Sequence, residues 1–227
     1  MGSGAKGSRS DRPKPRLRGR LHEAAFFVSI PAGFLLVVKA TGPKAVVAAA
    51  IYWLALSSQF GVSAAYHVGM WSEVGRERMR TLDHATIFVL IAGTYTPFCL
   101  LVLHGAATIV VLAIVWTGAA IGIATKLYRV DLHVLSGFLY LGLGWVAVIV
   151  FPALVRDPTS TELALMVAGG LLYTGSALVL ALHRPNPWPR TFGYHEIWHA
   201  ATIGAAACLY AAILSVFLSS YLSPAAG

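Results

Sequence analysis

The fold is decided by a long apolar stretch, residues 193–219, with the sequence GYHEIWHAATIGAAACLYAAILSVFLS. About 20 apolar residues in a helix cross the hydrocarbon core of a bilayer, so this stretch predicts a membrane span. His195 and His199 lie four residues apart at its start, which places both imidazoles on one helix face, roughly 5–6 Å apart at Cβ. Placing imidazoles at the end of a membrane helix costs free energy, so histidines at this position usually have a function. The pair therefore indicates a site that could share one metal ion.

The composition excludes an ordinary soluble domain. Hydrophobic residues make up 57% of the chain, charged residues only 11%, and the mean hydropathy is +0.71. We therefore expect the chain to bury its apolar surface in lipid. The net charge of +8 could suggest nucleic acid, but much of the basic excess lies before residue 21. Because a basic segment ahead of membrane spans more often sets topology and contacts anionic lipid, we expect membrane lipids and no nucleic acid as partners.

The chain divides into a tail and one membrane domain. Residues 1–21 are rich in Gly, Ser, Pro and basic side chains, which predicts a disordered cytoplasmic tail. Residues 22–222 contain seven apolar stretches, which predicts an all-α integral membrane protein of seven transmembrane helices. These stretches are residues 23–38, 45–66, 83–103, 106–125, 132–151, 163–182 and 193–219.

The distribution of basic residues predicts the orientation. Of the 17 Lys and Arg residues, only Lys39, Lys44 and Arg156 fall on one side of the alternating connections. Since the cytoplasmic side carries the excess of Lys and Arg, the N-terminus is predicted in the cytoplasm and the C-terminus outside. The protein is thus expected to be a multi-pass protein of the cell membrane.

This topology brings polar residues from three spans to one depth. His67 ends the second span, Asp83 begins the third, and His195 and His199 begin the seventh, all on the cytoplasmic side. Three histidines with an open fourth position are typical of catalytic zinc, whereas structural zinc is usually closed by four protein ligands. The sequence therefore predicts Zn²⁺ held by these three histidines, where it would polarise a carbonyl and activate water.

Two further residues are candidates for catalysis. Asp83 could accept a proton from the water, orient a histidine or act as a fourth ligand. Ser63 precedes His67 by four residues and shares its helix face, so its hydroxyl could hydrogen-bond the water or a substrate oxygen. His84 is about 100° from Asp83 on the helix and is expected to point away from the site. His22 and His183 are expected to be solvated at the membrane surface.

The same pair of histidines also spells H-E-x-x-H, the motif in which a glutamate serves as general base of a metalloprotease. Residues 200–227 contain no Asp, Glu or His, so a third ligand would have to come from upstream. The context therefore argues against a protease. Glu196 could lie near the site or face the cytoplasmic connection.

Four motifs together carry a resemblance to the hemolysin III group of the progestin and adipoQ receptor family. They are SAAYH at 63–67, RTLDH at 80–84, GTYTP at 93–97 and GYHEIWH at 193–199. The resemblance implies a bacterial membrane protein of seven helices with a cytoplasmic N-terminus. It also implies zinc on the positions of His67, His195 and His199, with Ser63 and Asp83 beside the zinc-bound water.

Two functions follow as hypotheses. The first is a zinc-dependent hydrolase of an amide or ester bond in a membrane lipid, and the wider superfamily that the chain resembles includes alkaline ceramidases. The second is a protein with structural zinc that acts without chemistry, in cytolysis, signalling or membrane homeostasis.

Overall fold

The computed structural model describes residues 15–128, 133–154 and 160–222, and in these ranges the protein is all-α apart from one isolated bridge between Trp188 and Phe192. Six of the helices are long and apolar enough to cross a membrane, and the described part of α5 contains a shorter apolar segment, Gly137–Ala147. This confirms an all-α membrane protein. The helices are α1 Arg20–Lys39, α2 Gly42–Val68, α3 Glu73–Leu101, α4 Ala106–Leu127, α5 His133–Leu154, α6 Ser160–Leu182 and α7 Tyr194–Leu222.

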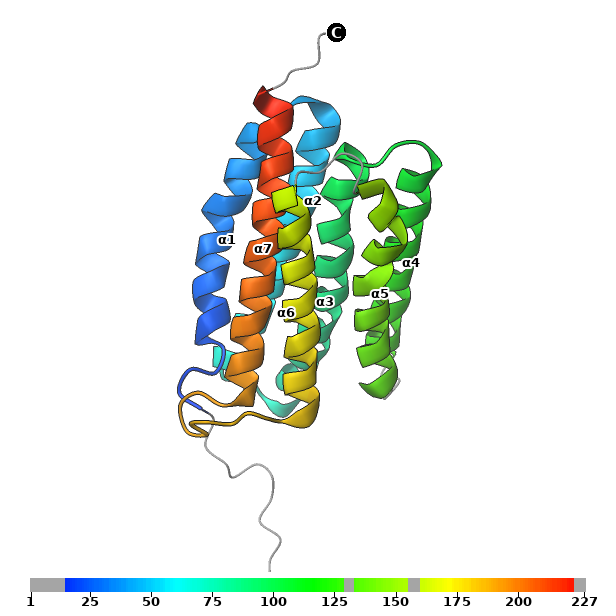
Figure 1. Ribbon diagram of the computed structural model, residues 1–227. Helices are drawn as coiled ribbons and strands as arrows, with labels where there is room; N and C mark the ends of the chain where they lie inside the picture. Colours follow the sequence, from blue (N-terminus) through cyan, green and yellow to red (C-terminus); the bar gives the residue numbers. More distant parts are fainter. Residues whose placement is uncertain (1–14, 129–132, 155–159, 223–227) are drawn as a thin grey trace, which may run out of the picture.

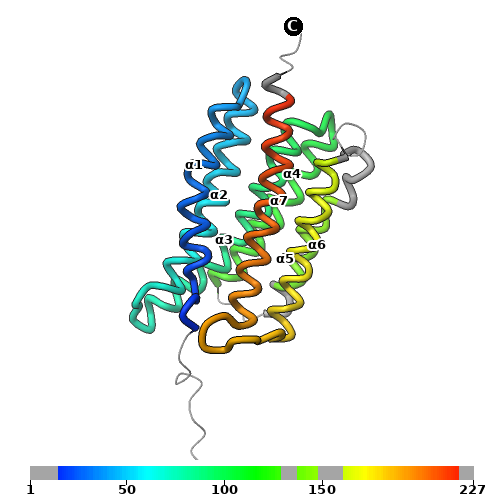
Figure 2. The backbone as a smooth tube through the Cα atoms, turned by 60° about the vertical axis from the view of Figure 1, so that its left-hand side comes forward, coloured from blue at the N-terminus to red at the C-terminus, as the bar shows by residue number. Residues whose placement is uncertain are grey.

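The helices run up and down in one bundle (Figure 1). α1, α3, α5 and α7 begin at the lower end in that view, where α2, α4 and α6 end. We call this the basic end, because in the described part of the chain it carries Arg16, Arg18, Arg20, Arg76, Arg78, Arg80, Lys126, Arg184 and Arg190. α7 packs against α1 on one side and α6 on the other (Figure 2). The residues that flank the connections at the basic end are therefore brought together in space.

Helix α3 begins ten residues before the predicted apolar span. Its first turns contain the charged residues that follow Glu73, which a hydropathy pattern does not recognise as part of a span. The helix starts there because Ser72 caps it, with its hydroxyl oxygen accepting a 3.2 Å hydrogen bond from the Gly75 N–H. Asp83 consequently lies inside α3, on its third turn, and is buried.

The predicted disordered tail, residues 1–21, falls mostly on residues 1–14, which lie outside the described residues. From residue 15 onward the chain is folded against the connection between α6 and α7. The N–H groups of Arg16 and Leu17 donate to the carbonyls of Arg190 and Thr191, at 3.1 and 3.3 Å. Gly19 then takes a φ of +80° and passes so close to α2 that an added Cβ would lie 2.6 Å from the Cβ of His67.

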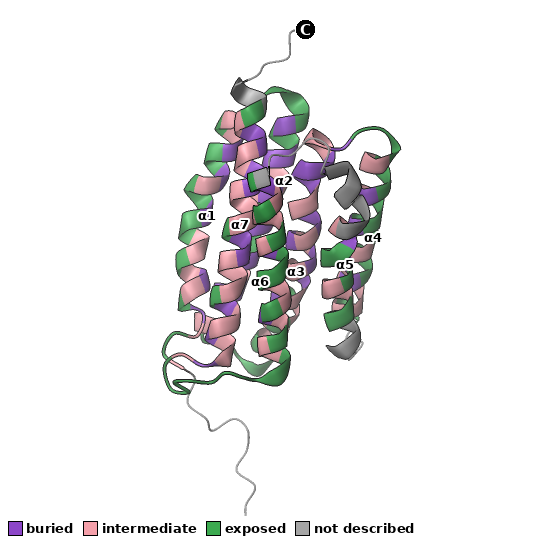
Figure 3. Ribbon diagram, viewed as in Figure 1, coloured by how far each residue is buried: buried purple, intermediate pink, exposed green. Residues whose placement is uncertain are grey.

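The burial pattern is that of a bundle in an apolar solvent (Figure 3). Large apolar side chains such as Tyr52, Phe88 and Phe217 fill the interior. Others of the same kind point outward, for example Phe27, Phe34, Ile109, Leu171 and Leu178. An outer surface so rich in large apolar side chains suits contact with lipid rather than water.

Gly93 sets the distance between α2 and α3. A Cβ at this position would lie 2.5 Å from the Cβ of Ala55, which is fixed to its own backbone and cannot rotate away. We expect Gly93→Ala to lower the unfolding free energy by about 1–3 kcal/mol, because the two helices would have to separate. Thermal unfolding in detergent measures this. The control is Gly142→Ala, whose added Cβ meets no atom within 4 Å, and equal losses in both variants would contradict the packing argument.

Candidate metal centre

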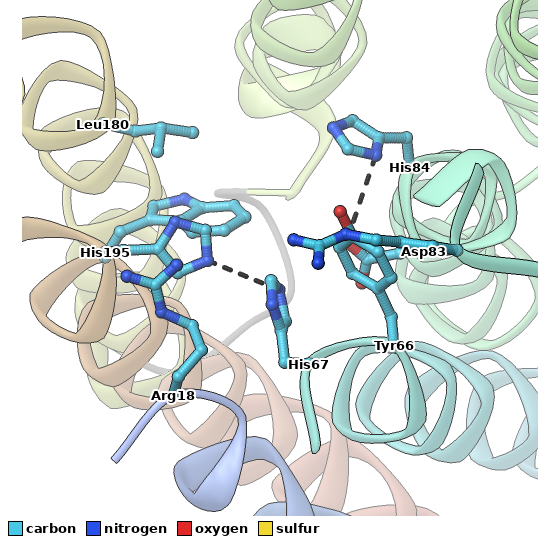
Figure 4. A pocket seen from close by; sticks show the side chains of 9 residues that line it. Arg18, Tyr66, His67, Asp83, His84, Leu180 and His195 are labelled. Atoms are coloured by element: carbon cyan, nitrogen blue, oxygen red, sulfur yellow. Dashed lines mark hydrogen bonds and ion pairs between the residues drawn. The ribbon is translucent and has the colours of Figure 1, made fainter. Parts of the chain in front are cut away.

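Three histidines from two helices converge at the basic end. His67 lies in the last turn of α2, while His195 and His199 lie in the first two turns of α7. The Nε2 atoms of His67 and His195 are 3.4 Å apart, and one ring nitrogen from each of the three residues lies within 4.8 Å of the others. Figure 4 shows His67 and His195 pointing toward one another across a cavity. This cluster could hold a metal ion, as the sequence predicted.

The chemistry of the cluster fits a metal. His199 is 1% exposed, and its Nε2 atom has no hydrogen-bond partner among the described residues. Leaving a buried polar atom unpaired is costly, and the His199 ring could meet this need by binding the same ion as the other two rings. A cation that accepts nitrogen ligands would satisfy all three rings at once.

The two predicted catalytic residues lie on the α2–α3 side of the cluster. Asp83 is 4% exposed, and its Oδ1 atom has no hydrogen-bond partner in the described part of the chain. Ser63 is buried one turn before His67 on α2. His67, Asp83 and His195 all line one cavity of about 240 Å³, and Figure 4 shows Asp83 facing it. The topology argument thus placed these side chains at the same end of the bundle correctly.

His22 is a member of the site that the sequence interpretation missed. It was expected to be solvated, yet it is 3% exposed, because α1 begins two residues earlier and packs on α7. Its ring stacks on that of His199, with centroids 3.9 Å apart and planes 15° apart. Its Nε2 atom is 3.4 Å from Oγ1 of Thr202, which donates to the His199 carbonyl at 2.8 Å. His22 therefore holds the plane of His199 in place.

Two other expectations about histidines were tested. His84 was expected to point away from the site, but it lines the cavity, with its Nδ1 4.0 Å from Oδ2 of Asp83. That expectation was wrong because an angle of 100° on a helix still leaves a long side chain within reach of a wide cavity. His183 is exposed, as expected.

Replacing His22 should weaken metal binding without removing any ligand. We expect His22→Ala to lower the affinity about tenfold to a hundredfold, the usual cost of losing a residue that orients a metal-binding histidine. His22→Phe keeps a flat ring against His199 and should recover part of the loss. Chelator competition on purified protein measures both. The control is His104→Ala, an exposed histidine elsewhere, and unchanged affinity in His22→Ala would contradict the positioning role.

Glu196 has a structural position that explains the H-E-x-x-H pattern. The side chain is 1% exposed, and its two oxygens are both engaged. Oε2 accepts a 2.8 Å hydrogen bond from the N–H of Gly193, and Oε1 accepts from Nε of Arg18. The first of these bonds is the one by which a glutamate in the first turn caps a helix. Because the carboxylate is committed to the helix start and to Arg18, the geometry does not favour Glu196 as the base of a protease.

The fold and site define a class: helical membrane proteins with a cluster of three histidines at one end of the bundle. Comparison with known proteins identifies the family of the chain. The profile of the family described as "Haemolysin-III related" matches residues 10–210. Hemolysin-3 from Bacillus cereus is 32% identical over 198 residues, covering 85% of this chain and 87% of that protein. The Hemolysin-3 homolog of Bacillus subtilis (strain 168) is 30% identical over 197 residues, covering 85% and 89%. The chain belongs to the haemolysin-III-related family.

Proposed function

We propose that the protein is a zinc-dependent hydrolase that cleaves an amide or ester bond of a membrane lipid. The observation that carries this is the set of three imidazole nitrogens within 4.8 Å of one another, beside a cavity that also exposes the Asp83 carboxylate. Structural zinc usually has four protein ligands, so a three-histidine site that opens on a cavity favours catalysis. A cavity at the end of an apolar bundle favours a substrate that arrives from the membrane.

Each residue has a distinct part in this proposal. His67, His195 and His199 would bind the ion, and zinc so held supplies a Lewis acid and an activated water. Asp83 would accept a proton at Oδ1, the atom with no hydrogen-bond partner among the described residues. Ser63, buried one turn before His67, would hydrogen-bond the water or a substrate oxygen. His22 would keep the His199 ring in the orientation that binding requires.

The site would face the cytoplasm, with seven helices crossing the cell membrane. In the described part of the chain, Lys39 and Lys44 lie at the end opposite to the site, while the arginines cluster at the basic end. The cytoplasmic side of a membrane protein carries the excess of basic residues. The metal would then lie near the headgroups of the inner leaflet, with the N-terminus in the cytoplasm and the C-terminus outside.

A second candidate is a protein without enzymatic activity that acts on the state of the membrane. It is favoured by the names of the two relatives, which refer to haemolysis. In that case the metal would stabilise the contact between α2 and α7, and turnover would not be needed.

Incubating purified zinc-loaded protein with bacterial lipid extract tests the proposal. We expect free fatty acid to accumulate, detected by mass spectrometry, and accumulation to stop when the metal is removed by a chelator and to resume when zinc is returned. Failure of the zinc-loaded protein to release an acyl product from any bacterial lipid extract would contradict the enzyme and leave the second candidate.

A further inference from the structure

The cavity contains two arginines that the proposed hydrolysis does not use. Arg18 belongs to the segment before α1 and lies beside His195 (Figure 4). Arg76 is in the first turn of α3, seven residues before Asp83 and therefore on the same face of that helix. The two guanidinium groups thus reach the cavity from different elements of the fold, with the histidine cluster between those elements.

Neither guanidinium is fully neutralised within the described part of the chain. Arg18 uses its Nε to pair with Glu196, and this leaves its two terminal nitrogens for the cavity, where the side chain is 22% exposed. Arg76 is exposed and makes no ion pair in the described ranges. Glu23, which lies at the same end, pairs with Arg20.

Two guanidinium groups and one carboxylate therefore line the cavity. Asp83 is the one carboxylate that lines it among the described residues, because Glu196 is buried behind Arg18. The exposed Glu73 and the half-buried Glu77 also lie at this end but do not line the cavity. A bound divalent ion would add to the positive charge, so the cavity is suited to a ligand that carries an anion.

The rest of the lining is apolar or aromatic. Tyr66, Leu180 and Trp198 provide surface that an anion alone would not use. A ligand that satisfies the whole lining needs a negatively charged group at one end and an apolar part at the other. Guanidinium groups recognise phosphate in particular, since their planar N–H groups match its oxygens in pairs.

We propose that this cavity binds an amphiphile with a phosphate-like anionic group, which Arg18 and Arg76 hold while Leu180 and Trp198 contact its apolar part. The substrate class of the proposed hydrolase would then be an acylated anionic lipid rather than a neutral one. The naming of a substrate rests on the proposed function, whereas binding of the anionic amphiphile does not.

Binding of dodecyl phosphate to the full chain in dodecyl maltoside micelles tests the proposal. Quenching of tryptophan fluorescence can report it, because Trp198 lines the cavity. We expect saturable binding that Arg76→Gln weakens roughly tenfold to a hundredfold, as the loss of a charged hydrogen bond does. Arg76→Lys should retain part of the affinity. Arg78→Gln is the matched control, since Arg78 is exposed on the same helix but does not line the cavity.

Each of the other possible outcomes would contradict a specific part of the binding proposal or of the proposed function. Equal weakening by Arg76→Gln and Arg78→Gln would mean attraction to the general positive surface and not to this cavity. Inorganic phosphate that binds as tightly as dodecyl phosphate would show a site for a free anion and contradict the amphiphile. Binding of dodecyl phosphate without any lipid turnover would contradict the proposed hydrolase but support the anionic-amphiphile site. Turnover of lipids with neutral headgroups, without binding of dodecyl phosphate, would support the hydrolase but contradict the anionic-amphiphile site.

Discussion

Replacing Asp83 with asparagine is expected to lower the turnover of lipid roughly a hundredfold to ten-thousandfold, the usual contribution of a general base, while the metal stays bound. Asparagine has nearly the same shape as aspartate, so the bundle should still fold. The substitution removes the negative charge of the carboxylate, whose Oδ1 atom has no hydrogen-bond partner among the described residues. Turnover and metal content should be measured on the same preparation.

The control for this variant is Glu73→Gln, which removes a carboxylate from the same helix at an exposed position outside the cavity. It should keep full turnover. If Asp83→Asn lost the metal together with turnover, Asp83 would be a ligand and not a base. If it kept both, the hydrolase mechanism would be wrong and a metal that only stabilises the fold would be favoured.

Replacing Arg18 with alanine is expected to lower the unfolding free energy by about 3–5 kcal/mol, because it leaves the buried carboxylate of Glu196 without its ion-pair partner. Glu196 is 1% exposed, so water replaces the lost partner poorly. Chemical or thermal unfolding in detergent measures the change. The control is Arg16→Ala, an exposed arginine in the same segment whose backbone N–H donates the hydrogen bond to Arg190, so that the substitution leaves this bond in place.

A second substitution separates loss of the ion pair from general damage. Glu196→Gln removes the charge that Arg18→Ala would leave unpaired. The double variant, Arg18→Ala with Glu196→Gln, should therefore be more stable than Arg18→Ala alone. Glu196→Gln by itself should keep the metal and the lipid hydrolysis. A peptide product that this variant no longer forms would instead support the protease interpretation of H-E-x-x-H.

The histidine cluster could be predicted from the sequence because two local rules combined. Residues four apart share a helix face, which pairs His195 with His199 and Ser63 with His67. Counting helices and basic residues then assigned His67 and Asp83 to the end of the bundle where His195 lies. Neither step requires knowledge of how the helices pack, since the alternation of direction along the chain is sufficient.

The supporting residues could not be predicted in this way because their roles depend on tertiary contacts. His22 looked like a surface residue, and only the packing of α1 against α7 puts it on His199. Arg18 was part of a segment that reads as disordered, yet its charge neutralises a glutamate 178 residues away in the sequence. The polar start of α3 likewise lacks an apolar signal, although the Ser72 cap is a local feature that could have indicated it.

The account depends most on one claim, that His67, His195 and His199 together hold a metal ion. The direct measurement is the metal content of purified protein by elemental analysis, wild type against His195→Ala, with the exposed His104→Ala as control. We predict about one zinc per chain in the wild type and in His104→Ala, and almost none in His195→Ala, because two imidazoles do not complete a site of this kind. Equal metal content in wild type and His195→Ala would contradict the account.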